Sequence, residues 1–371
     1  MRVLVLCKRQ YTGKDLLDDR YGRLFELPVA LASRGHEVYV LAASYRPKGN
    51  SFRTEAGVDW HSIDIFRSPF GYRQRLRQLL TNSRPDVIWA SSDVLHGIGG
   101  SFFARKAGIP IVIDLYDDYE SFALTSALNL VAPFRRACAK AAALSVVTRS
   151  LAVTVERRAP ESSHIEIIGN GVPEGFCARA GRDEARRVLG LPVAARLIGT
   201  AGALDASRSI DDLLQAYKQL RRRRDDVRLV LAGPRDRATA AFMAKYDGVI
   251  DLGLLAHEQV PWLYSALDVG VVCNRDSAFG RACHPQKLVE MAACGLPMIV
   301  AEVGDAATML SQANLYPVGD SLTLSQRLER QLIEPAAVPS SLALRWDRLA
   351  AALEALLQRA VDGFQRELGS T

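Results

Sequence analysis

The sequence predicts an α/β protein of two domains, each with a parallel sheet covered by helices on both faces. Short apolar segments alternate with segments of helical periodicity along the whole chain. The apolar segments are nearly continuous, which is typical of strands buried on both faces of a parallel sheet. Glycine and proline cluster at residues 170–194 and divide this pattern into two halves. A length of 371 residues also suits two domains.

Each half supplies enough strands for a sheet of its own. In the first half, the expected strands are residues 2–7, 36–42, 86–90, 109–113, 144–148 and 165–168. In the second half, they are residues 196–200, 227–232, 249–252, 269–272 and 297–300. Apolar residues at helical spacing predict helices at 22–34 and after residue 209, and a long terminal helix at 346–368. Both halves are therefore expected to be Rossmann-like.

The composition excludes several classes of protein. Hydrophobic residues make up 49% and charged residues 24%, as in an ordinary globular protein and unlike a disordered chain, a collagen or a coiled coil. No stretch approaches the ~20 apolar residues of a membrane span. The start of the sequence lacks the features of a secretory signal, so a cytoplasmic location is expected. Six cysteines without a C-x-x-C pair predict reduced thiols rather than disulfides or a metal site.

The positive charge is concentrated in the first half of the chain. The formal net charge is +6, and residues 1–175 hold 23 basic against 18 acidic side chains. Two segments there, 66–80 and 131–144, combine arginines with aromatic residues. Such helices can lie at an anionic lipid surface, so we expect peripheral contact with the inner membrane through both segments. A solvated helix face is the alternative interpretation, and no pattern predicts nucleic-acid binding.

The last third of the chain contains the most specific motif, HPQKLVEMAACGLPMIVAEVG at residues 284–304. Pro285 suits the first turn of a helix and Gly295 suits its exit into a strand. The motif resembles the K-L-x-E-x-M-A-x-G-x-P-V-V signature of the retaining glycosyltransferases of family 4. Trp346 matches the start of the terminal helix of that family. Further segments resemble the family in the same order: 34–44, 84–90, 107–117, 167–176 and 254–272.

This resemblance implies the GT-B fold, in which two Rossmann-like domains face each other across a cleft and the last helix crosses back to the first domain. The implied boundaries are an acceptor-side domain at 1–175, a donor domain at 176–340 and the helix at 341–371. The implied activity is sugar transfer, with retention, from a nucleotide-sugar donor to the hydroxyl of a glycan or lipid-linked acceptor. No metal or other cofactor is expected. Polysaccharide or lipopolysaccharide biosynthesis is the expected setting.

Residues 202–212 are expected to bind the diphosphate of the donor. Helix N-termini and cationic side chains stabilise phosphate charge without a metal. The segment resembles the G-R-L-x-x-x-K-G loop of the family, with Gly202 as its glycine and Arg208 at the lysine position, whereas Ala203 replaces the arginine. Arg208 is therefore the expected catalytic cation, and a surface arginine is the alternative. Ser209 and Asp212 are also spaced as a capping box.

Glu290 is the strongest single candidate for donor binding. It lies three residues after Lys287 on the motif helix, a spacing that also suits a simple ion pair. The resemblance implies that Glu290 accepts the ribose hydroxyls and that Lys287 belongs to the same site. The second glutamate of the family motif is replaced by Ala282. The adjoining loop, with Asp276, Arg281 and His284, is expected to surround the donor sugar.

The first domain is expected to supply the acceptor side. Its loop at 11–23 follows the first strand, where the family carries a glycine-rich loop, and it does not match a P-loop. The residues expected there are Gly13, Lys14, Gly22 and Arg23, with His96 as a further candidate. Asp114, at the end of a strand, resembles the family position that contacts the transferred sugar and is the second expected catalytic residue.

Two other functions fit the same sequence. A nucleotide-sugar epimerase can share this two-domain plan, because a fold does not determine chemistry. A non-catalytic family member that binds partners is the other alternative, and the replacements at Ala203 and Ala282 favour it.

Overall fold

The computed structural model describes residues 1–11, 13–159, 164–179 and 181–369 and divides into two compact units. The N-terminal unit comprises Met1–Asn170, Ala282–His284 and Arg345–Thr371. The C-terminal unit comprises Gly171–Arg281 and Pro285–Leu344. The implied domain boundaries lie a few residues from these limits. The sequence did not indicate that Ala282–His284 belongs to the N-terminal unit.

The N-terminal unit is built on one eight-stranded sheet with the order β10-β9-β8-β7-β1-β4-β6-β5. All its strands pair in parallel except β5, which is antiparallel to β6. The strands are β1 (Arg2–Lys8), β4 (Glu37–Ser44), β5 (Ser51–Glu55), β6 (Val58–Asp64), β7 (Val87–Ala90), β8 (Ile111–Leu115), β9 (Ala143–Val146) and β10 (Ile165–Ile167). A small hairpin, β2 (Gln10–Tyr11) and β3 (Lys14–Asp15), follows β1.

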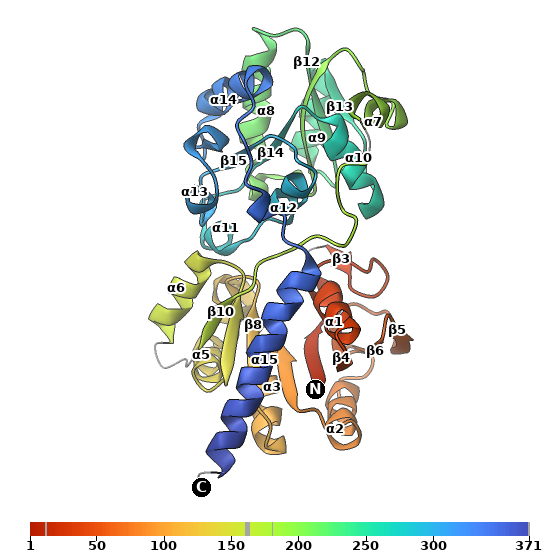
Figure 1. Cartoon of the computed structure of the whole chain (residues 1–371), viewed down its shortest axis with the longest axis vertical. Coiled ribbons are helices and arrows are strands. Elements are labelled where there is room, and N and C mark those ends of the chain that lie inside the picture. Colours follow the sequence, from red (N-terminus) through yellow and green to blue (C-terminus); the bar gives the residue numbers. More distant parts are fainter. Residues whose placement is uncertain (12, 160–163, 180, 370–371) are drawn as a thin grey trace. The chain divides into compact units, whose positions relative to one another are not determined.

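Helices cover this sheet and form two apolar cores with it. They are α1 (Arg23–Ser33), α2 (Gly71–Asn82), α3 (Val94–Ala107), α4 (Ala123–Ala127), α5 (Val131–Ala139), α6 (Arg149–Arg158) and α15 (Trp346–Gly369). The terminal helix α15 lies along the sheet of this unit beside α1 (Figure 1). Its leucines share a core with β1 and α1. Among the described residues, no helix combines the length and apolar character needed to cross a membrane.

The C-terminal unit contains a six-stranded, wholly parallel sheet with the order β13-β12-β11-β14-β15-β16. Its strands are β11 (Arg196–Ala201), β12 (Val227–Ala232), β13 (Val249–Asp251), β14 (Val269–Val272), β15 (Met298–Ala301) and β16 (Leu315–Tyr316). Its helices are α7 (Arg182–Val188), α8 (Ile210–Arg221), α9 (Arg237–Lys245), α10 (Val260–Ala266), α11 (Ala278–Ala282), α12 (Gln286–Ala293), α13 (Ala306–Met309) and α14 (Ser321–Ile333). The predicted α/β class, with parallel sheets in two domains, is thus confirmed.

Two strands of the N-terminal sheet were not predicted from the sequence. β6 alternates buried apolar residues such as Trp60 with polar ones such as His61, so it lacks the continuous apolar run of a central strand. β5 is an edge strand with largely exposed side chains. The edge position of β5 explains why its sequence lacks a continuous apolar run, because such a strand is partly exposed to solvent. None of the six cysteines, all of which the structure describes, forms a disulfide bond.

A buried ion pair joins α1 to the centre of the N-terminal sheet. The Arg23 guanidinium donates to both oxygens of Asp114, at 2.6 and 3.0 Å, and also to the carbonyls of Ile168 and Gly169. Ser91 and Ser145 donate to the same carboxylate at 2.7 and 2.6 Å. Arg23 is 2% exposed and Asp114 is fully buried. The network therefore connects α1, three strand ends and the segment that leads out of the unit.

This network changes the interpretation of two predicted site residues. Asp114 was expected to contact the transferred sugar, but both of its oxygens are occupied by internal donors. Arg23 was expected on the acceptor side, but its donors are directed into the unit. Sequence could not indicate this pairing, because the two residues lie 91 positions apart. Both are better described as positioning residues for the loops at this end of the sheet.

We predict that Arg23→Met destabilises the protein by about 3–5 kcal/mol, because it leaves a buried carboxylate without its cation. Urea unfolding followed by circular dichroism measures this loss. Arg20→Met is the matched control, since Arg20 is an exposed arginine in the same loop whose pair with Glu55 should contribute about 1 kcal/mol or less. Equal losses in the two variants would contradict the structural role assigned to Arg23.

Candidate active site

The topology of the C-terminal sheet fixes where a ligand can bind. From β11, the chain proceeds through β12 and β13 on one side and through β14, β15 and β16 on the other. The loops after β11 and β14 therefore diverge at the carboxyl ends of these two strands. Ligands of open α/β sheets bind at such a switch point. The predicted donor residues belong to these two loops and to α12, which follows them.

The loop after β11 is closely packed against the loop after β12. Gly202 has a φ of 101°, and a Cβ atom built on Gly233 would lie 2.0 Å from the Gly202 carbonyl oxygen. Only glycine allows this approach of two backbones. Gly202 is exposed, but its backbone N–H already donates to the Ala232 carbonyl at 2.9 Å, so the turn offers an exposed glycine without a free N–H at this position.

Two cationic side chains belong to this region. Lys287, at the start of α12, donates to the Thr200 hydroxyl at 3.4 Å, and its ammonium would lie 3.6 Å from a Cβ atom on Gly202. The Arg208 guanidinium lies over the Phe279 ring, with its Cζ atom 4.7 Å from the ring centroid. Lys287 therefore reaches the carboxyl end of β11, and Phe279 restrains Arg208. Both cations are placed to approach a phosphate group.

Glu290 lies one turn after Lys287 on α12 and is 5% exposed. Its carboxylate accepts hydrogen bonds from the Tyr264 hydroxyl, at 3.3 Å, and from the His257 ring, at 3.1 Å. The Glu290 carboxylate also forms an ion-pair contact with the His257 ring at 3.1 Å. The carboxylate is thus held in a fixed orientation, with hydrogen-bond acceptor capacity that these two donors do not use.

The predicted capping box at the start of α8 is wrong. Ser209 has a left-handed backbone with a φ of 51°, and its side chain makes no capping hydrogen bond. The Asp212 carboxylate instead accepts the backbone N–H of Gly319 at 3.0 Å. Spacing alone suggested the box, but the left-handed turn directs the serine side chain elsewhere.

The loop between β14 and α12 is divided between the two units. Asp276 and Arg281 form an exposed ion pair at 2.5 Å in the C-terminal unit, and this pair lowers the pKa of Asp276. Ala282 is buried in an apolar core of the N-terminal unit, and its carbonyl accepts from Thr148. A glutamate at this position would place its charge among apolar side chains, which accounts for the alanine.

His284 also makes its bonds within the N-terminal unit. Its Nδ1 accepts the backbone N–H of Asn170 at 3.1 Å, and its carbonyl accepts the Asn170 side-chain amide at 2.8 Å. The ring is 7% exposed and lies against Gly169. His284 therefore belongs to the N-terminal unit, whereas Arg281 belongs to the C-terminal unit. The sequence-based expectation of one sugar-binding loop included neither this division nor the burial of His284.

In the N-terminal unit, the loop after β1 is organised by a buried arginine. Arg9 donates to Asp15 at 3.0 Å and to Asp18 at 3.2 Å. Burial acts to raise the pKa of Asp15, but the hydrogen bonds from Arg9 and from backbone N–H groups outweigh it and lower the pKa to about 2. The loop is thus rigidly held by charge, and Arg9 was not among the predicted residues.

The predicted acceptor residues of this loop differ in their surroundings. Gly13 has a φ of 76° and open space beside it, and Lys14 lies over the Tyr21 ring at 5.9 Å. Gly22 packs on Tyr11, where a side chain would collide with the tyrosine hydroxyl. Of this set, Gly13 and Lys14 therefore remain the candidates for ligand contact.

His96 lies at the other side of the switch point in this unit, in the first turn of α3. Its Nδ1 is 2.7 Å from the carboxylate of Asp93, which also caps the helix and accepts the Tyr45 hydroxyl. The His96 ring is 5% exposed. Asp93 was missed in the sequence, although an aspartate directly before a helical segment is a recognisable capping signal.

Three residues that contact Glu290 or Arg208 were also not predicted from the sequence: His257, Tyr264 and Phe279. Each is aromatic and lies in a segment that the sequence analysis singled out, but none carried a local sign of its role. Their partners, Glu290 and Arg208, lie 26–71 positions away in the chain. Only the folded chain brings these pairs together.

Both units of the chain match models of known glycosyltransferase domains. Residues 23–171 match the model of the glycosyl transferase 4-like domain, and residues 195–333 match that of the glycosyl transferases group 1. The two matches cover both units of the chain and include α12.

Two of the curated relatives come from Mycolicibacterium smegmatis. A GDP-mannose-dependent alpha-mannosyltransferase is 29% identical over 293 residues, which are 74% of this chain and 73% of that protein. A D-inositol 3-phosphate glycosyltransferase is 27% identical over 55% of this chain. The chain matches 50% of the length of this second relative.

Solved structures show the same fold. Sucrose-phosphate synthase from Thermosynechococcus elongatus aligns over the whole of both chains with a TM-score of 0.76 and 16% identity. HepE from Anabaena, in complex with UDP, aligns with 100% of this chain and 99% of that one, with a TM-score of 0.67 and 17% identity. From the two domain models, the motif on α12 and the shared fold, we conclude that this chain belongs to the GT-B glycosyltransferases of the family 4 type.

Proposed function

We propose that this protein transfers a sugar from a nucleotide-sugar donor to a hydroxyl acceptor with retention of configuration. The observation that carries the proposal is the buried Glu290 carboxylate, held on the same helix as Lys287, whose ammonium reaches the glycine turn after β11. A carboxylate suits two ribose hydroxyls, and a cation beside an exposed glycine turn suits a diphosphate. The two groups lie one helical turn apart, as the parts of one nucleotide require.

The proposed chemistry needs no nucleophilic side chain from the protein. The acceptor oxygen attacks the anomeric carbon on the face from which the diphosphate departs, and a departing phosphate oxygen takes the acceptor proton. Lys287 and Arg208 stabilise the negative charge that grows on the diphosphate. We include the absence of a metal or other cofactor in this proposal, because these two cations supply the positive charge.

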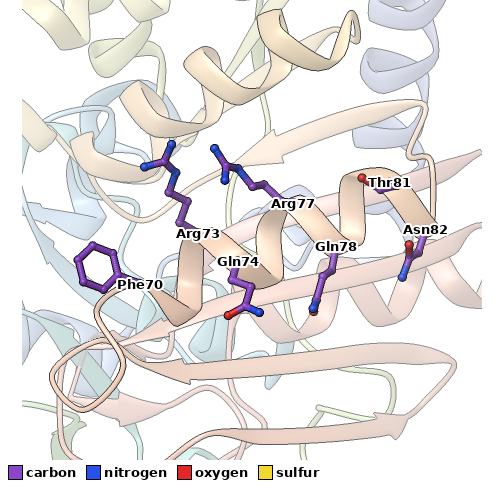
Figure 2. Close-up of a pocket in the computed structure, with 7 residues that line it drawn as sticks. All are labelled: Phe70, Arg73, Gln74, Arg77, Gln78, Thr81 and Asn82. Atoms are coloured by element: carbon purple, nitrogen blue, oxygen red, sulfur yellow. The ribbon is translucent and has the colours of Figure 1, made fainter.

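The acceptor class belongs to the same proposal. We infer a glycan or lipid-linked acceptor of polysaccharide or lipopolysaccharide biosynthesis, presented at an anionic membrane surface. The support is the helix α2, which has no acidic residue and exposes Phe70 (81%) beside Arg73 and Arg77. Figure 2 shows both arginines projecting from one side of α2. The two arginines line an open hollow of about 530 Å³.

The structure restricts this surface to part of the predicted segments. In residues 131–144, Phe134 is 1% exposed and packs in the core, and Arg135 pairs with Glu120 at 2.7 Å. In residues 66–80, the Arg75 guanidinium bonds to the ring of His61 at 2.8 Å. The basic and aromatic surface therefore comprises the exposed face of α2 together with Phe66 and Phe70, which precede the helix and are 68% and 81% exposed. The contribution expected from 131–144 is withdrawn.

A thermal-shift screen with UDP-, GDP-, ADP- and TDP-sugars tests the donor proposal. A ligand that binds only the native state raises its melting temperature, so at least one donor should do so. Product analysis without an acceptor distinguishes the epimerase alternative, because an epimerase alters the sugar by itself. Absence of any shift would favour the non-catalytic alternative.

We predict that Glu290→Ala weakens binding of the selected donor by about tenfold to a hundredfold, because a hydrogen bond to a buried charge contributes about 1.5–3 kcal/mol. Isothermal titration calorimetry measures the change. Glu258→Ala, an exposed glutamate, is the control and should bind as wild type does. Unchanged affinity in Glu290→Ala would contradict the ribose assignment.

We predict that Arg208→Ala lowers kcat more than it raises the KM for the donor. The charge on the diphosphate increases as the glycosidic bond breaks, so the cation stabilises the transition state more than the ground state. Because Ala203 cannot share this task, the loss should be large. Steady-state hydrolysis or transfer of the selected donor measures it, and equal kcat values would overturn the role of Arg208.

We predict that the protein binds phosphatidylglycerol vesicles reversibly and that salt weakens the binding. Each basic side chain near an anionic surface contributes about 1 kcal/mol, within a Debye length of about 8 Å at physiological salt. Co-sedimentation of a Phe70→Ser/Arg73→Glu/Arg77→Glu variant should fall well below that of wild type.

The control for this experiment carries two charge reversals elsewhere. Arg222→Glu/Arg366→Glu changes two exposed arginines outside α2 and lowers the net charge by the same amount as the two reversals on α2. It should sediment nearly as wild type does. Equal loss in both variants would mean that overall charge, rather than the α2 surface, controls the binding.

A further inference from the structure

The Glu290 carboxylate is held from two sides by one short segment. The Tyr264 hydroxyl, from α10, donates to Oε2 at 3.3 Å, and the His257 ring, from the turn before α10, contacts Oε1 through Nε2 at 3.1 Å. An ionised carboxylate can only accept hydrogen bonds, so Nε2 of His257 must carry the proton. Each carboxylate oxygen therefore receives one donor from the protein.

Exposure increases along this chain of contacts. Tyr264 is 1% exposed, the Glu290 side chain is 7% exposed and the His257 side chain is 25% exposed. The His257 ring also packs against Phe176, with ring centroids 5.2 Å apart. His257 is thus restrained on the solvent side of the carboxylate, and a ligand that reaches Glu290 does so beside this ring.

We propose that His257 is a positioning residue that makes the donor site selective for ribonucleotides over deoxyribonucleotides. The inference rests on the proposed binding of a nucleotide donor. A carboxylate has about four lone-pair positions, and His257 and Tyr264 each engage one. The fixed orientation directs a remaining position on each oxygen towards the two ribose hydroxyls, one for each oxygen.

The energetic consequence follows from burial. A deoxyribonucleotide keeps the 3′-hydroxyl but lacks the 2′-hydroxyl, so it desolvates Glu290 and leaves one carboxylate oxygen without its new partner. A site built for hydroxyl groups rejects such analogues strongly. If the carboxylate could rotate, it would find other partners and the discrimination would decrease. The substrate class is accordingly a ribonucleoside diphosphate sugar rather than a thymidine diphosphate sugar.

The test measures affinity for UDP and GDP and for their 2′-deoxy and 2′,3′-dideoxy counterparts by calorimetry. Wild type should prefer the ribonucleotide that it binds by more than tenfold. His257→Ala should reduce this preference by about tenfold, mainly through weaker ribonucleotide binding. His257→Gln should restore most of it, because the glutamine amide can donate from a similar place. Glu258→Ala, next to it in the chain and exposed, should keep the wild-type preference.

Two outcomes separate the possible failures. If wild type binds UDP or GDP but His257→Ala weakens ribose and dideoxy forms equally, or changes neither, the positioning role of His257 is overturned while the donor proposal stands. If wild type binds neither nucleotide, the donor proposal for these two bases fails and the inference fails with it. In a Glu290→Ala background, His257→Ala should have no further effect on the preference, and an additive effect would also overturn the inference.

Discussion

Parallel pairing of the strands is the constraint on which both halves of this protein depend. In each unit, the connections between parallel strands return the chain to the same end of the sheet, so the parallel strands all run in one direction. The loops that follow these strands therefore gather at their carboxyl ends. In the N-terminal unit these are the loops after β1 and β7, and in the C-terminal unit those after β11 and β14. Most of the polar residues predicted as site residues lie in or directly after these loops, because they follow the carboxyl ends of parallel strands.

Buried charge holds these loops in place. In the N-terminal unit, the ion pairs of Arg23 with Asp114 and of Arg9 with Asp15 connect separate segments of the chain. In the C-terminal unit, Glu290 is held by His257 and Tyr264. A buried ion needs several partners to offset its desolvation, so each pair fixes the orientation of the groups around it. These contacts determine how precisely a ligand could be oriented at either sheet.

The two departures from the family pattern have different physical settings. Ala282 packs in an apolar core of the N-terminal unit, where a carboxylate would be costly. Ala203 adjoins Gly202 in the turn after β11. Arg208 follows in the same loop, and Lys287 reaches this turn from α12. The alanine at position 282 is thus explained by packing. At position 203, the alanine leaves Arg208 and Lys287 as the cations proposed to stabilise the diphosphate. The proposed transfer chemistry depends on the second setting.

The sequence by itself determined the features that local periodicity encodes. Continuous apolar segments identified most central strands, the spacing of Lys287 and Glu290 placed them on one helix, and the pattern after Trp346 predicted α15. It did not determine which side chains pair, because such pairs depend on strand order and on how helices pack. Asp114 meets Arg23 across 91 positions, Glu290 meets His257 across 33, and Phe134 turns inward although its segment looks like a surface helix. Only the tertiary structure decided these, because hydrophobic periodicity reports burial but carries no information about long-range partners.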